Sequence, residues 1–159
     1  MKKSFLVLIA TLMATSCSKE KDPCEGLVLD VIQQLLVVEI VNLNGDNLIE
    51  NGTYEANTIF TDRNGTKTIP VVYDKSQLPN LPEELKNVIV INIFNSKSEL
   101  NTVSIHLSEE EVDVLSMNLE VKSEGCSGSF YKIIGINYNQ EPIEFDDIGN
   151  NYYKITVVK

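Results

Sequence analysis

The sequence lacks several residues on which common functions depend. Its 159 residues include no tryptophan, one histidine (His106) and one arginine (Arg63). The 13 lysine and arginine residues face 23 aspartate and glutamate residues, so the formal net charge is −10. This charge would repel a polyanion and thus argues against nucleic acid as a partner. One histidine is also too few for a histidine-based zinc site.

The single histidine limits nucleophilic catalysis as well. A Ser-His-Asp or Cys-His site would have to use His106 as its base. Val103, Ile105 and Leu107 alternate with polar residues, and this period of two places His106 on the solvent side of a strand. We therefore predict no catalytic residue, no enzyme activity and no cofactor.

No apolar run is long enough to cross a bilayer. Phe5–Met13 has nine residues, whereas a spanning helix needs roughly 20. Lys2 and Lys3 precede this run, and small residues and then Cys17 follow it. The order of basic, apolar and small residues before a cysteine indicates an export signal.

Residues 14–17 resemble the lipobox of bacterial lipoproteins. Thr15 and Ser16 fit the two positions before the cysteine, and Ala14 replaces the usual leucine, a relaxation seen in lipoproteins of the Bacteroidota type. The resemblance implies cleavage before Cys17 and acyl chains such as palmitate on that residue. It also implies a lipid anchor in the outer membrane, with the protein facing the periplasm or the cell surface. An ordinary secreted protein with a free Cys17 thiol is the alternative.

Three regions follow from this interpretation: a signal peptide at residues 1–16, a lipidated tether at 17–25 and one domain at 26–159. The charged segment Ser18–Asp22 resembles the surface-export signal of the same lipoproteins, although Lys21 interrupts its acidic pair. Loss of two lysines with the signal leaves 11 basic and 23 acidic residues, a net charge of −12. An anionic membrane surface would repel this charge, so the lipid must provide the membrane contact.

Two cysteines remain if Cys17 carries lipid. Cys24 and Cys126 form an even pair in an exported chain, which predicts a disulfide between them. Two unpaired thiols are the alternative.

From Leu27 onward the chain alternates β-prone runs with turns. Asn64-Gly65 lies between two such runs and is a strong hairpin signal. Residues 115–122 alternate apolar and polar side chains, as expected for a half-buried strand. Residues 74–87 contain two prolines and are expected to form a loop that crosses between two sheets. Seven to nine short strands predict an all-β fold, a single antiparallel β-sandwich.

The later half, residues 115–159, resembles the small immunoglobulin-like domains of Bacteroidota lipoproteins. The resemblance depends on the turn Gly125–Gly128, the tyrosine-ended hairpin Asn137–Asn139 and a final tyrosine-rich strand. It implies an immunoglobulin-like type of sandwich and the same location. It implies no activity, because such families are largely without an assigned one.

Three groups of residues are candidates for binding or chemistry. In the segment that begins at Asn42, side chains with oxygen atoms stand at alternating positions and resemble a calcium-binding loop. Two positions depart from such a loop, because Asn47 stands where glycine is needed and Thr53 where a bidentate glutamate belongs. A hairpin turn is therefore the alternative. Paired acids could hydrolyse glycosides or be solvated turn residues, and strand tyrosines could form a ligand-binding patch or fill core edges. The calcium candidates are Asn42, Asn44, Asp46 and Glu50; the acids are Glu109, Glu110, Glu111 and Asp113, with Glu141, Glu144, Asp146 and Asp147; the tyrosines are Tyr131, Tyr138, Tyr152 and Tyr153.

The leading hypothesis is a lipid-anchored, non-catalytic binding, accessory or adhesive module whose protein or glycan ligand is unknown. A small glycan-active enzyme that uses paired carboxylates is one alternative, and a carbohydrate-binding module is the other. Two acids converging in a cleft would favour the enzyme, and coplanar exposed tyrosines would favour the carbohydrate-binding module.

Overall fold

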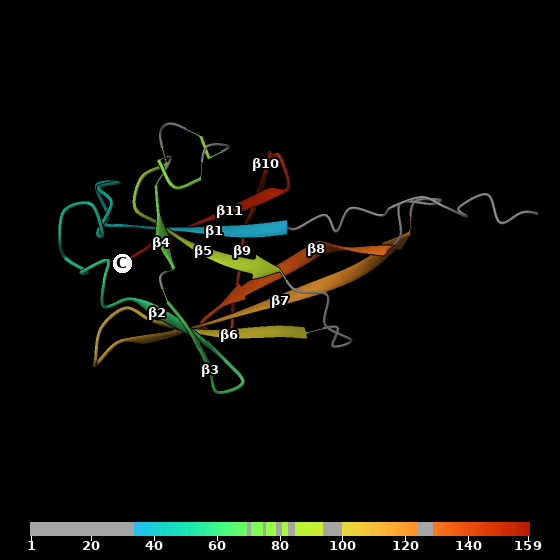
Figure 1. Ribbon diagram of the computed structural model, residues 1–159, viewed down its shortest axis with the longest axis horizontal. Coiled ribbons are helices and arrows are strands. Elements are labelled where there is room, and N and C mark those ends of the chain that lie inside the picture. The colour runs from blue at the N-terminus through green and yellow to red at the C-terminus, as the bar shows by residue number, and fades with distance from the viewer. Residues whose placement is uncertain are drawn as a thin grey trace, which may run out of the picture.

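The described part of the chain forms β-strands and no helix. The computed structural model in Figure 1 describes residues 34–69, 71–74, 76–78, 81–82, 85–93, 100–123 and 129–159. One sheet contains β1 (Gln34–Val41), β4 (Val72–Tyr73), β5 (Val88–Ile93), β10 (Asp146–Gly149) and β11 (Tyr152–Val158). The other contains β2 (Phe60–Arg63), β3 (Thr66–Thr68), β6 (Leu100–His106), β7 (Val112–Ser123), β8 (Ser129–Tyr138) and β9 (Glu141–Ile143).

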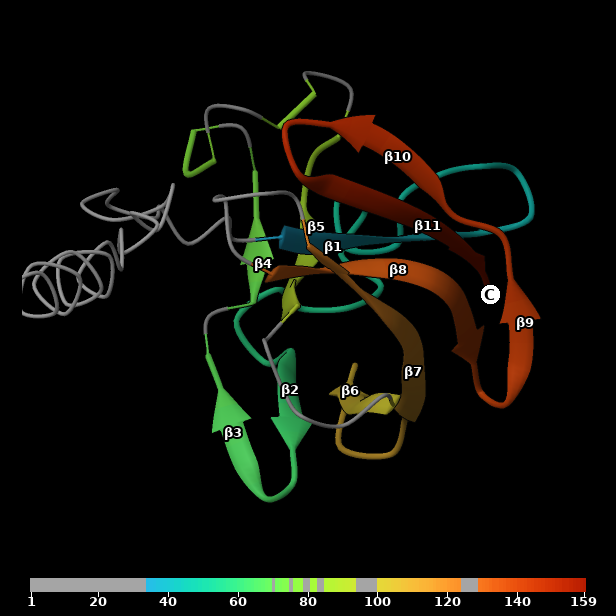
Figure 2. The ribbon, with the colours of Figure 1, turned by 90° about the vertical axis from the view of Figure 1, so that its right-hand side faces the viewer.

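The two sheets lie in two layers, as Figures 1 and 2 show. The five-stranded sheet has the order β10-β11-β1-β5-β4, and the six-stranded sheet has the order β3-β2-β6-β7-β8-β9. This arrangement confirms the all-β prediction and is consistent with a β-sandwich. No helix among the described residues has the length and apolar character needed to cross a membrane.

Two details differ from the sequence prediction. The described residues form eleven strands rather than seven to nine, because β3, β4, β9 and β10 have only two to four residues each. Strands this short show no alternating pattern. The sheets are also not wholly antiparallel, because β1 pairs with β11 in parallel. These strands are the first and last of the series, so no hairpin connects them.

Tight turns set the register of two hairpins. Asn64 and Gly65 join β2 to β3 with φ values of 53° and 80°, which confirms the predicted hairpin. Asn139 and Gln140 join β8 to β9 with φ values of 50° and 72°. Positive φ at both turn positions matches the twist of the flanking strands, so Tyr138 lies opposite Glu141.

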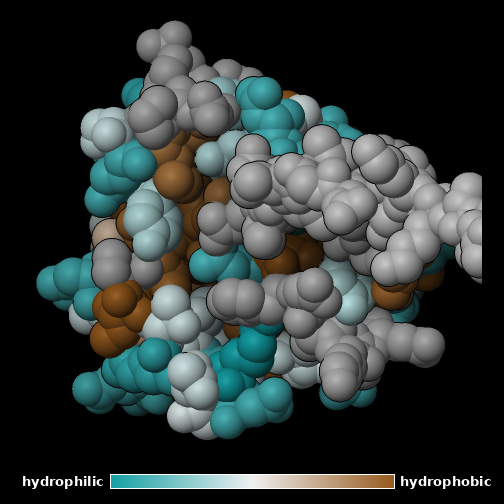
Figure 3. All heavy atoms as spheres, turned by 45° about the vertical axis from the view of Figure 1, so that its right-hand side comes forward, coloured by the Kyte–Doolittle hydropathy of each residue, from teal (hydrophilic) through white to brown (hydrophobic). Residues whose placement is uncertain are grey.

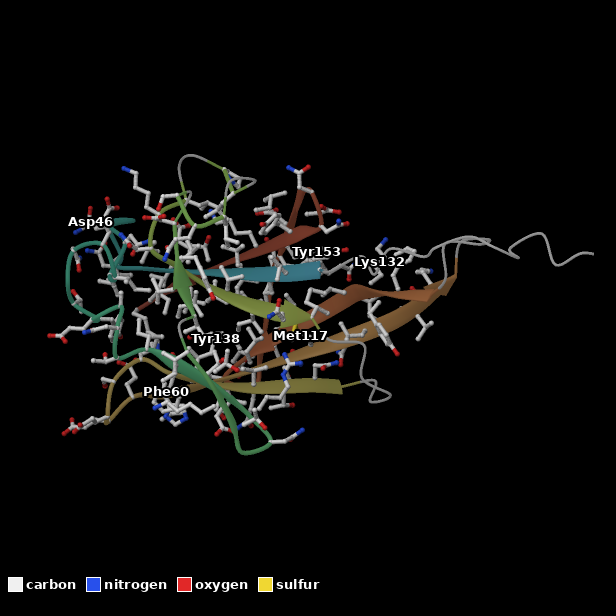
Figure 4. All side chains as sticks on the ribbon, in the orientation of Figure 1. Asp46, Phe60, Met117, Lys132, Tyr138 and Tyr153 are labelled. Carbon is white, nitrogen blue, oxygen red and sulfur yellow. The ribbon has the colours of Figure 1, made fainter. Side chains whose placement is uncertain are left out.

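The main core lies between the two layers. Every second residue along a strand points its side chain into this core. Leu36, Val38 and Ile40 supply the contribution of β1, and they are fully buried. Figure 4 shows Met117, Tyr138 and Tyr153 pointing into the same space. The alternation along β6 and along the first part of β7 therefore placed the core-facing residues correctly, whereas Val121 near the end of β7 is 57% exposed.

A second apolar cluster covers the outer face of the five-stranded sheet. Leu81 and Leu85 pack there against Val37, Val88 and Tyr152. The expectation that residues 74–87 cross between sheets is wrong, because they connect β4 and β5, which are antiparallel neighbours in one sheet. Leu81 and Leu85 of this segment instead cover part of the outer face, which explains why β1 carries an apolar residue such as Val37 on that face as well.

Apolar side chains also reach the surface of the described residues. Leu43 is 90% exposed, and Ile134 and Val121 are more than half exposed. Figure 3 shows apolar surface interleaved with hydrophilic surface on the face that it draws. Scattered exposed residues of this kind are normal for a folded domain and by themselves indicate no site.

The two ends of the layers differ in what they hold. β1 begins at Gln34 on one end, where β7 also finishes and β8 starts (Figure 1). The loop between β1 and β2, the turn between β6 and β7, and the last residue, Lys159, lie at the opposite end. An eight-residue strand such as β1 separates these ends by about 26 Å.

Candidate functional site

The most connected group of polar side chains lies at the end of the molecule where β11 finishes. It brings residues from three separate parts of the chain around one lysine ammonium group. We call this group the carboxylate clasp. Its members are Tyr54, Glu111, Asp113, Tyr138, Asn139 and Lys159.

Asp113 is the centre of the clasp. On β7 it occupies a core-facing position, in alternation with Leu115 and beside the main core, and only 3% of it is exposed. Its carboxylate accepts hydrogen bonds from the Tyr138 hydroxyl and the Asn139 amide, each at 2.6 Å. Lys159 Nζ lies 2.6 Å from the same carboxylate. A buried carboxylate is tolerated only with partners of this kind.

Lys159 joins the two layers. Its Nζ also lies 2.7 Å from Glu111, and the Tyr54 hydroxyl donates to the other oxygen of that carboxylate at 2.8 Å. The Lys159 backbone N–H donates to the carbonyl of Val41 at the end of β1. Lys159 follows β11 in the five-stranded sheet, whereas Asp113 belongs to the six-stranded sheet, so the ion pair connects the sheets directly.

The turn after β8 has a conformation that suits the clasp. Asn139 adopts a left-handed backbone conformation that asparagine tolerates well. Its N–H donates to the Val114 carbonyl at 2.7 Å, and its Oδ1 accepts from the Val114 N–H at 2.8 Å. These two bonds fix the turn against β7, so the remaining Asn139 amide group points at Asp113.

The surroundings keep the clasp ionised. Burial alone would raise the pKa of Asp113, but hydrogen bonds from Asn139, Lys159 and Tyr138 lower this pKa below its usual value. Burial opposes the charge of Lys159, yet Asp113 and Glu111 raise the pKa of its ammonium group. Burial and the bonds to carboxylates raise the pKa values of Tyr138 and Tyr54, so both stay protonated.

This ionic state fits cohesion better than acid catalysis. A general acid needs a carboxyl group with a raised pKa that holds a proton at neutral pH. The pKa of Asp113 is lowered instead, and Lys159 occupies the space between it and Glu111. The clasp therefore holds the layers together and offers no transferable proton at Asp113.

The remaining acids lie apart from this pair. Glu109 and Glu110 are exposed in the turn between β6 and β7. The second predicted group lies on and beside β9 and β10, and all of its members are exposed. That group comprises Glu141, Glu144, Asp146 and Asp147.

The calcium candidates use their side chains to close a turn. Asn42 Oδ1 accepts from the N–H groups of Asn44 and Asp46 at 2.8 and 2.9 Å, and its amide donates to the Asp46 carboxylate. Glu50 points to Lys86, with 3.9 Å between the charged atoms. In the described ranges no three His, Cys, Asp or Glu side chains are grouped so as to hold a metal ion. These contacts favour the turn interpretation.

The tyrosine candidates fill the core rather than a surface patch. Tyr138, Tyr152 and Tyr153 are each at most 7% exposed, and the half-buried Tyr131 packs against the main core. The interpretation that they fill core edges is therefore right, and a shared exposed platform is not formed.

His106 lies on the outward face of β6, as the alternation predicted. It stacks on Phe60 of β2 with 4.1 Å between the ring centroids, and Lys67 Nζ lies 3.6 Å from the Phe60 centroid. Figure 4 shows Phe60 on the side of β2 that faces away from the five-stranded sheet.

The predicted lipidation site Cys17 and the predicted disulfide between Cys24 and Cys126 lie outside the described residues.

The fold and the clasp together define a two-sheet, all-β protein whose layers are joined by a buried ionic group. No protein-family model, curated protein or solved structure matches the chain.

Proposed function

We propose that this chain is a lipid-anchored protein of the bacterial outer membrane, with an immunoglobulin-like β-sandwich that serves as a non-catalytic binding, accessory or adhesive module. The observation that carries the proposal is the order of residues 1–17: two lysines, an apolar run of nine, three small residues and Cys17. Acyl chains on Cys17 would anchor the protein despite its acidic charge.

The layout of the described residues supports display from such an anchor. The chain enters the sheets at Gln34, and the loop between β1 and β2 lies at the opposite end (Figure 1). An anchor before Gln34 leaves that far end and the outer face of the six-stranded sheet available to a partner. The lowered pKa of Asp113, together with its contact with Lys159, argues against a role for that carboxyl group as a general acid.

Fatty-acid labelling in a bacterium that processes lipoproteins tests the anchor. The full chain should take up an alkyne-tagged palmitate and fractionate with the outer membrane. Cys17→Ala should abolish both, whereas the matched control Cys24→Ala should retain both. Label on Cys17→Ala at the level of the parent protein would disprove the anchor.

A disulfide between Cys24 and Cys126 belongs to the same proposal. The described residues nearest to the two cysteines in sequence, Gln34 on one side and Ser123 and Ser129 on the other, lie at the same end of the layers (Figure 1). An exported protein meets oxidising conditions, which favour a disulfide between the two thiols. Thiol titration of the unreduced, denatured protein should find no free thiol once Cys17 is acylated, and two free thiols would contradict the bridge.

A further inference from the structure

An open groove lies on the outer side of the six-stranded sheet, where β9 leaves β8. Figure 2 shows the chain continuing from β9 in one layer to β10 in the other. We call the hollow beside this connection the β8 groove. Its lining residues include Asn118, Gly135, Asn137, Pro142, Glu144 and Asp146.

Gly135 keeps the floor of the groove low. It lies opposite Asn118 in the pairing of β7 and β8, and its backbone does not adopt the left-handed conformation that favours glycine. A Cβ at this position would lie 3.5 Å from Asn118 Nδ2, which is an ordinary contact. The backbone at this position would therefore accept a side chain. The absence of one in Gly135 leaves space next to the Asn118 amide.

The polar side chains around this space have no side-chain partner among the described residues. Among the contacts of the described residues, the side-chain amides of Asn118 and Asn137 form no hydrogen bond, and Glu144 and Asp146 form no ion pair. Each amide offers two N–H donors and an acceptor oxygen side by side, and each carboxylate offers two acceptor oxygens. Neighbouring hydroxyl groups match such paired donors and acceptors.

Apolar surface completes the groove. Ile134, next to the irregular pairing of β7 and β8, is 59% exposed, and Pro142 on β9 is also exposed. Small-molecule sites commonly combine apolar surface with a few polar groups that fix orientation. A sugar ring presents C–H groups that pack on apolar side chains and hydroxyl groups that pair with amides and carboxylates.

The charge of the groove selects among ligands. None of the described residues that line it is a lysine or an arginine, and its two carboxylates would repel a phosphate, sulfate or uronate group. A purely cationic ligand would use Glu144 and Asp146 but would leave the donor groups of both amides without partners. An uncharged ligand with many hydroxyl groups uses all four side chains.

We propose that the β8 groove binds a neutral glycan, with Asn118, Asn137, Glu144 and Asp146 pairing with its hydroxyl groups over the floor formed by Gly135. This assignment deepens the proposed binding function by naming the class of ligand. It does not depend on the anchor, because none of these residues belongs to the first 33.

Calorimetry on the full chain, purified in detergent, tests the proposal. The probes are gluco-, xylo- and manno-hexaoses, with oligogalacturonate and hexalysine as charged counter-probes. We expect at least one neutral hexaose to bind and oligogalacturonate not to bind. Gly135→Val should weaken that binding by about tenfold or more because it fills the floor, and Asn137→Ala should weaken it about three- to tenfold.

The control variant is Ile69→Ala, which shortens an exposed apolar side chain that does not line the groove and should leave binding unchanged. Asn137→Ala changes only a surface side chain, so it remains informative if Gly135→Val folds poorly. Failure of every neutral hexaose to bind, binding that both groove variants leave intact, or preference for hexalysine would overturn the proposal. Palmitate labelling at Cys17 without hexaose binding would retain the anchor and reject the glycan.

Discussion

The clasp and the β8 groove both contain asparagine and carboxylate side chains and differ in whether those side chains already have partners. In the clasp, Asp113 has three partners within 2.6 Å and is almost completely buried. In the groove, Asn118 and Asn137 use none of their side-chain hydrogen-bonding capacity within the described part of the protein. Residue type alone does not separate a structural polar group from a binding one; the state of its hydrogen bonds does.

The comparison leads to opposite expectations for substitution. A change in the clasp leaves a buried charge without its partner and should cost stability. A change in the groove removes groups that already contact water and should alter binding with little effect on stability.

The largest effect is expected for Lys159→Met, which keeps the length of the side chain and removes its charge. Asp113 would stay buried without an ionic partner, so the free energy of unfolding should fall by about 3–5 kcal/mol. The control Lys122→Met breaks the exposed pair with Glu120 and should cost less than about 1 kcal/mol. Urea denaturation measures both, and equal losses would show that the clasp does not join the layers.

The two tyrosine hydroxyl groups of the clasp should also differ in how much each contributes to the stability of the fold. Tyr138→Phe removes a donor from the buried Asp113 and should cost about 1–3 kcal/mol. Tyr54→Phe removes a donor from Glu111, whose side chain is 37% exposed, so water can replace it and the loss should stay below about 1 kcal/mol. A larger loss for Tyr54→Phe in the same denaturation assay would place the centre of the clasp at Glu111.

Stability should depend on pH at both extremes. Since the pKa of Asp113 is lowered by folding, its contribution is complete above the ordinary value of 3.8 and is lost as the pH falls through the lower folded value. Since the pKa of Lys159 is raised, its contribution is complete below 10.5 and is lost as the pH rises through the higher folded value. Denaturation curves recorded across pH should lose part of the acid-side slope in Asp113→Asn, and an unchanged slope would contradict this assignment.

Local patterns predicted the strands and turns because each depends on neighbouring residues. The Asn64-Gly65 turn and the alternation along β6 and β7 are of this kind, since backbone preference and one buried face decide them. The short strands β4 and β10 form only because longer neighbours offer them an edge. No sequence pattern of period two can reveal a two-residue strand.

The clasp could not be predicted because its members are distant in sequence. Tyr54 and Glu111 are 57 positions apart, and Lys159 meets them only after both sheets have formed. One signal was available: the alternation along residues 112–122 places Asp113 on the core face, where a charged residue needs a partner. The identity of that partner required the three-dimensional structure.

The smallest effect on stability, and the sharpest test of the comparison, is expected for Gly135→Ala. Alanine restricts the unfolded chain more than glycine does, and at a position that accepts a side chain this stabilises a protein by about 0.4–1 kcal/mol. The backbone of Gly135 and the 3.5 Å contact with Asn118 meet that condition. The same methyl group would occupy the floor of the β8 groove and should weaken binding of a neutral hexaose. Unfolding and calorimetry on one preparation should therefore give a more stable protein that binds less tightly. A destabilised variant would mean that Gly135 is required by the backbone at the irregular pairing, and the groove would then lose its main support.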